Sequence, residues 1–119
     1  MIGNGDAHFK NWSIIYPDGI NPSLSPLYDV VPTVLYIPND DLGLNLNGSR
    51  AFEDVTPARF ERMGERTGFG AQEARRRATD TAIRVLDSWS VLGEHLAPDP
   101  YRRLTDRLKA LPLASAITS

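Results

Sequence analysis

Three oxygen-bearing side chains near the start of the chain have the types and the spacing of a phosphoryl-transfer site. Asp6 is followed five residues later by Asn11, and Asp29 comes eighteen residues after Asn11. In such sites an aspartate accepts the proton of the attacking hydroxyl, while an asparagine and a second aspartate hold the magnesium that bridges the nucleotide phosphates. The spacing predicts Asp6 as the general base, and Asn11 and Asp29 as the metal and cofactor ligands.

A hairpin between Asn11 and Asp29 is expected to bring these two side chains together. Trp12 to Tyr16 are apolar, aromatic and β-branched and are followed by a turn signal, and a second short strand fits Leu24 to Tyr28. Both ligands are equidistant from Ile20, so an in-register hairpin would place them opposite each other, roughly 5 Å apart between backbones. Magnesium suits such a pair because it takes few protein ligands.

Two segments together carry a specific signature. Residues 3–13 read Gly-Asn-Gly-Asp-Ala-His-Phe-Lys-Asn-Trp-Ser, and residues 24–33 read Leu-Ser-Pro-Leu-Tyr-Asp-Val-Val-Pro-Thr. They resemble the catalytic and metal-binding segments of HipA-family serine/threonine kinases, the toxins of bacterial toxin-antitoxin modules. The resemblance implies Asp6 as catalytic base and Asn11 and Asp29 as metal ligands, with His8 and Lys10 as further members of the catalytic set.

His8 lies two residues after Asp6, where it is expected to orient that carboxylate or to fix the loop by a hydrogen bond. A zinc site is not supported, because the chain has two histidines and no cysteine. Asn4-Gly5 stands where most protein kinases have His-Arg, and Val30-Val31 stands where they have Phe-Gly. Both departures occur in the family that the chain resembles.

A kinase of this family also needs an N-terminal lobe with a phosphate-covering loop and a lysine that pairs with the phosphates. Neither is identified in this chain, which begins at the catalytic loop. Gly68-Phe69-Gly70 is the nearest glycine-rich stretch, but it follows a helical pattern and predicts a helix-to-helix turn. We therefore expect the C-terminal catalytic portion of such a kinase, inactive without an N-lobe.

The family resemblance also implies the partners of the chain. ATP and Mg²⁺ would be the cofactors, a protein of the translation machinery would be the substrate, and a HipB-like helix-turn-helix antitoxin would be the partner. DNA would be reached only indirectly, through the antitoxin. Two alternatives stay open. One is a non-catalytic remnant or partner-binding lobe, and the other is a small-molecule kinase of the aminoglycoside-phosphotransferase kind, against which Lys10 and the Pro-x-Tyr-Asp form of the second segment count.

Composition sets broad limits on the kind of protein. The 119 residues fit one globular unit, and a net charge of −2 gives no basic field that points to nucleic acid. No cysteine is available for disulfides or thiolate metal sites. Neither a membrane span nor a signal peptide is recognised, so a cytoplasmic location is expected.

The fold class expected is α+β, a partial protein-kinase-like C-lobe in two parts. Residues 1–50 would hold the catalytic loop, the metal-binding hairpin and an activation-segment-like region with a solvated turn at Asp40-Asp41. Leu42 to Gly48 alternate apolar and polar residues and end in Asn-Gly, which predicts a strand followed by a turn.

Residues 51–119 would form a bundle of about three helices. Thr56-Pro57 predicts the start of the first helix and Gly68 its end. An apolar stripe predicts one long helix from about Ala71 to Leu96, whose Arg75-Arg76-Arg77 cluster is expected to be a solvated face. Asp99-Pro100 would start the last helix, and residues 112–119 would be a frayed tail.

Overall fold

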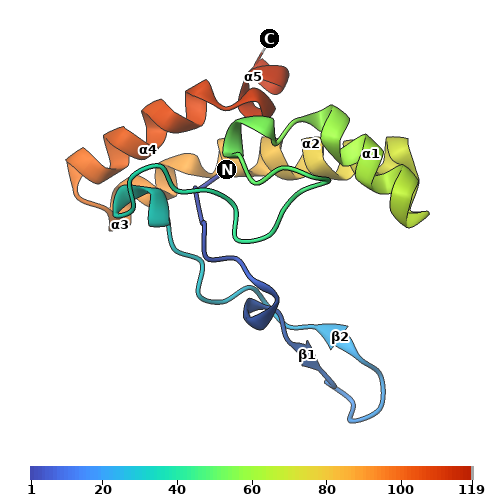
Figure 1. The fold of residues 1–119 in the computed structure, drawn as a ribbon. Coiled ribbons are helices and arrows are strands. Elements are labelled where there is room, and N and C mark those ends of the chain that lie inside the picture. The colour runs from blue at the N-terminus through green and yellow to red at the C-terminus, as the bar shows by residue number, and fades with distance from the viewer. Residues whose placement is uncertain (119) are drawn as a thin grey trace.

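A layer of helices carries an N-terminal β-hairpin that projects away from it in the computed structural model, which describes residues 1–118 (Figure 1). In chain order the elements are η1 (Phe9–Asn11), β1 (Ile14–Ile15), β2 (Ser23–Leu24), η2 (Thr33–Leu35), η3 (Phe52–Asp54), α1 (Pro57–Thr67), α2 (Ala71–Asp87), η4 (Trp89–Val91), α3 (Leu92–His95), α4 (Pro98–Ala110) and α5 (Pro112–Thr118), where η marks a 3₁₀ helix. The expectation of a mixed, mostly helical chain is confirmed, and the likeness to a kinase C-lobe stays a prediction.

The hydrophobic core lies between α4, α5, η3 and η4. Its buried members are Phe52, Trp89, Leu104, Leu108, Leu111 and Ala114. The N-terminal part of the chain rests on this core through half-buried Val34, Leu35 and Leu42. The helical layer is therefore the base on which the N-terminal loops are held.

Helices α1 and α2 pack closely because small residues line their contact. Ala74, Ala78 and Ala82 of α2 are buried, and so is Gly64 of α1. The predicted ends of α1 are confirmed, since the Thr56 hydroxyl accepts a hydrogen bond from the Arg59 amide and Gly68 ends the helix in the left-handed conformation. The chain then turns through Gly70 into α2, which confirms the predicted helix-to-helix turn.

The prediction of one helix from Ala71 to Leu96 is wrong. Helix α2 ends at Asp87, where the Ser88 hydroxyl donates a hydrogen bond to the Arg84 carbonyl, and the chain continues as η4 and the short α3. The break turns Trp89 into the core, where its indole nitrogen donates to the Thr105 hydroxyl over 3.0 Å. Apolar residues keep a spacing of three or four on both sides of the break, so the apolar stripe alone did not indicate that the helix ends at Asp87.

The last third of the chain departs from prediction in two further ways. Helix α4 begins at Pro98 and not at Asp99-Pro100, because the first helical turn tolerates proline, which lacks an N–H donor. Asp99 instead bonds to Arg102 within that turn. Residues 112–118 form α5 and are not frayed, since Leu113 and Ala114 are buried. Ser119, the end of the predicted tail, lies outside the described residues.

The predicted strand at Leu42 to Gly48 is also wrong, although its turn is confirmed. Asn47 and Gly48 both have positive φ, and the backbones of Leu46 and Ser49 pair across them in a single bridge. No further strand lies beside this stretch among residues 1–118, so it folds back on itself, with the Leu42 amide donating to the Arg50 carbonyl over 2.7 Å. The alternation of apolar and polar residues indicated that the segment is half-buried, but it did not indicate a strand with which the segment could pair.

Across residues 1–118, no helix has both the length and the apolar character needed to cross a bilayer.

Candidate active site

The loop that carries Asp6 is a tight turn held by its own polar groups. The Asp6 amide donates to the Asn4 side chain over 3.0 Å, and the His8 amide donates to the Asp6 carbonyl over 2.9 Å. These bonds leave the Asp6 carboxylate exposed to solvent. The nearest charged neighbour is the His8 ring, whose Nε2 lies 3.6 Å from Asp6 Oδ1. That separation is longer than a hydrogen bond but close enough for a protonated imidazole to attract the carboxylate.

Asn11 ends the same loop, and its side chain also shapes it. Its Oδ1 accepts a hydrogen bond from the His8 amide over 3.0 Å, which closes residues 9–11 into η1. An amide oxygen has two lone pairs, so one stays available to a cation. The Lys10 side chain is exposed, and its carbonyl accepts the bond described next.

Tyr28 joins the second motif to the first. Its hydroxyl lies 2.8 Å from the Ser13 hydroxyl and donates to the Lys10 carbonyl over 3.2 Å. Asp29 follows directly and is exposed, with φ of 55°, in the left-handed region that aspartate tolerates better than most residues. Within residues 1–118 its carboxylate makes no hydrogen bond or ion pair. Tyr28 thus links the residue before this unengaged carboxylate to the loop that ends in Asn11.

The predicted hairpin register is wrong by two residues. Ile14 pairs with Leu24 and Ile15 with Ser23, so the hairpin is centred on Gly19 and not on Ile20. Continued to its open end, this register would place Leu27, and not Asp29, across from Asn11. The ladder does not reach that far, because η1 takes Asn11 out of extended conformation and the backbone pairing ends where Ser25 bonds to Ser13.

The solvated turn predicted at Asp40-Asp41 is wrong as well. Asp40 is half-buried, and its carboxylate accepts the Thr33 hydroxyl and the amide of Asp41. No sequence pattern predicted a role for Thr33 or Asp40. Their signal was present in Gly5, whose missing side chain leaves room for the Asp40 carboxylate.

Arg107 of α4 ties the first residue of the loop segment to the core. Its guanidinium donates to the Met1 carbonyl over 3.0 Å and lies 4.6 Å from the centre of the Phe52 ring. Burial lowers the pKa of Arg107 from its ordinary value, against the attraction of Glu53 and Asp40. The segment that leads into the Asp6 loop is thereby anchored by a charge at the edge of the hydrophobic core.

The Arg75-Arg76-Arg77 cluster is not an open basic patch. Arg76 and Arg77 both pair with Glu73, and Arg75 pairs with Glu61. Hydrogen bonds from Arg76 and then Arg77 lower the pKa of the exposed Glu73 to about 2. These ion pairs offset the positive charge of the cluster, in agreement with the predicted solvated face.

The apolar groove along α2, with a volume of about 760 Å³, contains none of Asp6, Asn11 or Asp29. It is lined by Met1, Ile2 and Val30 and by side chains of α1, α2, η4 and α5, so the residue directly after Asp29 lies at its wall. The candidate site is instead an open surface at the foot of the hairpin.

A magnesium ion fits the residues that this surface offers. Asn11 and Asp29 present one amide oxygen and one free carboxylate, both accessible, and these are the hard oxygen ligands that magnesium takes in small number. Within residues 1–118, no three carboxylate, imidazole or thiolate side chains converge on one point. A cation here would therefore complete its shell with water or phosphate oxygens.

The exposed loop of Asp6 and His8 is therefore joined through Tyr28 to the segment that carries a second, free aspartate. The sequence profile of the HipA-like C-terminal domain family matches residues 1–89. The chain therefore belongs to the HipA-like C-terminal domain family.

The similar proteins carry kinase names. "Putative kinase Y4mE" of Sinorhizobium fredii is 39% identical over 104 residues, which cover 77% of this chain and 24% of that protein. "Putative kinase Y4dM" of the same species is 56% identical over 50 residues, or 42% of this chain and 12% of that protein. A "Putative kinase" of Haemophilus influenzae is 44% identical over 36 residues, or 30% and 10%.

The chain thus spans about a quarter or less of the length of these relatives. No solved structure gives a significant match to it. The comparisons identify a member of a kinase family and leave the substrate and partners to be proposed.

Proposed function

We propose that this chain supplies the hydroxyl-activating and metal-binding part of an ATP-dependent serine/threonine kinase. The observation that carries the proposal is the bond from Tyr28 to the Lys10 carbonyl, which holds the Asp29 segment against the loop of Asp6 and Asn11. Family membership supports it, since the relatives are named kinases.

In this reaction Asp6 is the proton acceptor. The hydroxyl oxygen of a protein serine or threonine forms a bond to the γ-phosphorus of ATP, and the bond from that phosphorus to the β-phosphate oxygen breaks. The hydroxyl proton passes to the Asp6 carboxylate, which is exposed to an incoming chain. His8, with Nε2 at 3.6 Å from that carboxylate, would attract it when the imidazole is protonated.

Asn11 and Asp29 would hold magnesium, which neutralises charge on the phosphate oxygens when it is bound. Asp29 has a left-handed backbone, and Tyr28, the residue before it, is fixed by its bond to the Lys10 carbonyl. Strained backbone of this kind concentrates at functional sites. Lys10, exposed beside Asn11, supplies positive charge near the phosphates.

The family suggests the biological setting. We propose a toxin of a toxin-antitoxin system, with a HipB-like helix-turn-helix antitoxin and a substrate in the translation machinery. Because the chain spans about a quarter or less of its relatives, we further propose that the phosphate-covering loop comes from polypeptide outside these residues. By itself the chain should show little or no turnover.

A second candidate is a lobe that binds a partner without catalysis. It is favoured by the apolar surface of the hairpin region, where Phe9, Ile20 and Leu27 are each at least 75% exposed. Large exposed apolar patches mark protein interaction sites. The two candidates differ in whether the chain binds magnesium and ATP. The aminoglycoside-kinase alternative gains no support from the family match.

Asp6→Asn tests the proton acceptor in an intact protein that carries this segment. Asparagine keeps the shape of aspartate but cannot accept the proton, so the rate of phosphoryl transfer should fall roughly 10²- to 10⁴-fold. The measurement is transfer of labelled γ-phosphate under single-turnover conditions, with Asp106→Asn on the exposed face of α4 as the charge-matched control. Near-wild-type rates in Asp6→Asn would refute the assignment.

A further inference from the structure

The hydroxyl of Thr33 connects the catalytic loop to the segment that follows Asp29. Thr33 begins η2, and its Oγ1 accepts a hydrogen bond from the Gly5 amide over 2.7 Å. The same oxygen lies 3.2 Å from the Gly3 carbonyl and also bonds to the Asp40 carboxylate. Because a hydroxyl has one proton, it donates to only one of these acceptors at a time, and a carboxylate is the stronger of the two.

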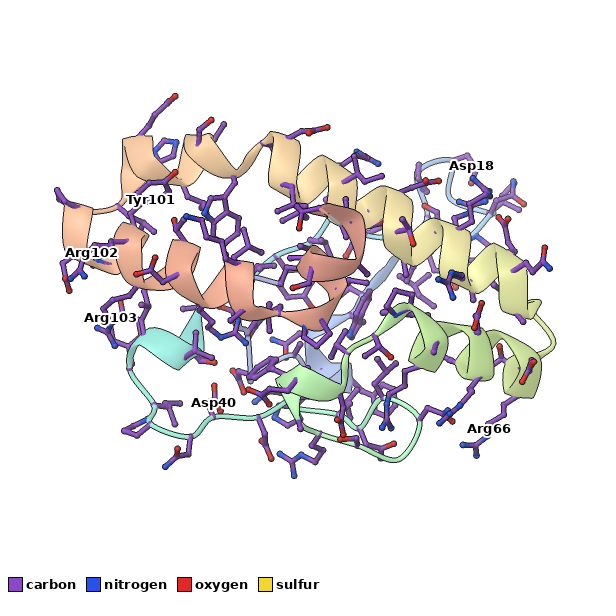
Figure 2. All side chains as sticks on the ribbon, turned by 90° about the horizontal axis from the view of Figure 1, so that it is seen from above. Asp18, Asp40, Arg66, Tyr101, Arg102 and Arg103 are labelled. Carbon is purple, nitrogen blue, oxygen red and sulfur yellow. The ribbon has the colours of Figure 1, made fainter. Side chains whose placement is uncertain are left out.

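Asp40 is the fixed end of this chain of bonds. Figure 2 labels it on the segment that follows η2, below the helical layer of that view. Its second oxygen accepts the Asp41 amide over 3.0 Å, and Asp41 is held by Arg50 over 2.9 Å. Arg50 in turn donates to the Leu42 carbonyl over 2.8 Å, so the segment that directly follows Asp40 is fixed.

Two glycines allow this segment to lie directly against the catalytic loop. A Cβ atom on Gly5 would lie 2.3 Å from an Asp40 carboxylate oxygen. A Cβ atom on Gly43 would lie 2.9 Å from the Gly5 carbonyl oxygen and 3.0 Å from that of Ala7. The backbone on either side of Asp6 therefore touches residues 40–43, with no side chain between them.

The Asp6 side chain itself is weakly restrained. Its carboxylate is exposed and has only the His8 ring nearby, at 3.6 Å, among residues 1–118. Its position is therefore set by the backbone to which it is attached. The bond from the Gly5 amide to Thr33 is a long-range hydrogen bond at that backbone, one residue before Asp6.

We propose that Thr33 and Asp40 are positioning residues that clamp the backbone before Asp6 to the segment after Asp29. The clamp sets the distance between the proton acceptor and the metal ligands, and this role rests on the function proposed above for Asp6 and Asp29. Neither residue touches the reacting atoms.

The clamp is tested by nuclear magnetic resonance on the 119-residue chain and three variants. Thr33→Val removes the hydroxyl at nearly constant shape, and Thr33→Ser keeps the hydroxyl. Asp40→Asn keeps the shape of the residue that accepts the Thr33 hydroxyl but removes its charge. Amide hydrogen exchange at Gly5 should speed up roughly 3- to 10-fold in Thr33→Val, the worth of one net hydrogen bond. It should stay near wild type in Thr33→Ser and rise by less in Asp40→Asn.

Amides of α1 and α2 serve as the internal control for folding, and their exchange should not change. Unchanged Gly5 exchange in folded Thr33→Val, or equal acceleration in Thr33→Ser, would overturn the clamp. If Thr33→Val does not fold, Asp40→Asn decides, because unchanged Gly5 exchange there would also overturn it.

Mn²⁺, used as a paramagnetic probe, separates positioning from simple stabilisation. With trace Mn²⁺, the wild-type chain should show a fixed ratio of broadening at Asp6 to broadening at Asp29, and this ratio should change in Thr33→Val because the distance between the two segments changes. An equal ratio in both proteins would contradict positioning. Absence of broadening at Asp29 in the wild type would refute the proposed metal site, and Gly5 exchange would still decide the clamp.

Discussion

At the scale of single residues, the hairpin tip shows how one carboxylate organises a loop. Asp18 accepts hydrogen bonds from the amides of Ile20 and Asn21, and from the Asn21 side chain. Figure 2 places it at the edge of the molecule, far from Asp40. These bonds, the Asn21 amide first, lower the pKa of Asp18 from 3.8 to about 2, although the residue is fully exposed.

The Asp18 pKa gives a testable pH dependence. Because the pKa is lower in the folded turn than the ordinary 3.8, the ionised form stabilises the turn above about pH 4, and that contribution is lost as the pH falls towards 2. Carboxyl-detected magnetic resonance titration should show a midpoint near 2, with the Ile20 and Asn21 amide shifts following it. In Asp18→Asn those two amides should not titrate. An Asp18 midpoint near 3.8 would show that the loop bonds do not form in solution.

At the scale of elements, the contact between α1 and α2 depends on the absence of a side chain at Gly64. The Gly70 amide donates to the Gly64 carbonyl over 3.0 Å, so the turn between the helices folds back onto this glycine. A Cβ atom there would lie 2.3 Å from the Gly70 carbonyl oxygen and 2.7 Å from the Ala74 Cβ. Backbone atoms cannot yield as a flexible side chain can.

Gly64→Ala should therefore destabilise the fold although alanine favours helices. The gain in helix propensity is at most about 1 kcal/mol, while overpacking costs about 1–3 kcal/mol. Urea unfolding should show a net loss of about 1–2 kcal/mol in the free energy of unfolding. Arg62→Ala on the exposed side of α1 is the control, with a change within about 0.5 kcal/mol. A Gly64→Ala variant more stable than the wild type would contradict this packing.

Local signals predicted the elements whose ends are set by nearby residues. Thr56 precedes the start of α1 and Gly68 marks its end, and Asn47-Gly48 forms the predicted turn. Each of these residues acts on backbone within a few positions of itself. The break at Ser88 and the helix at residues 112–118 depend on the burial of Trp89 and Leu113 in the folded chain. The spacing of apolar residues alone does not show that burial.

The same distinction holds at the candidate site. The types and spacing of Asp6, Asn11 and Asp29 indicated the family, and the family match confirms that recognition. Their placement did not follow the predicted hairpin register, because Asn11 closes η1 and Tyr28 makes the cross-link. Their roles stay proposals.

At the scale of the whole molecule, the helical layer is the base from which the hairpin projects (Figure 1). Arg107, Val34 and Leu42 hold the N-terminal segment on the core, while the hairpin beyond it is held by few contacts. The chain can thus present Asp6, Asn11 and Asp29 to polypeptide or ligand outside these residues. The proposed function therefore predicts that Asn11 and Asp29 bind magnesium in the 119-residue chain itself.

The most direct test of that claim is calorimetry of magnesium-dependent ATP binding by the 119-residue chain. Asp29→Asn is the informative variant, because asparagine also tolerates the left-handed backbone and removes only the charge. Asp106→Asn is the control with the same charge change on α4, and Trp89 fluorescence reports folding. We predict binding by the wild type and Asp106→Asn, and at least about tenfold weaker binding by Asp29→Asn, since a charged ligand is lost. Equal binding by Asp29→Asn, or no binding by a folded wild-type chain, would contradict the account.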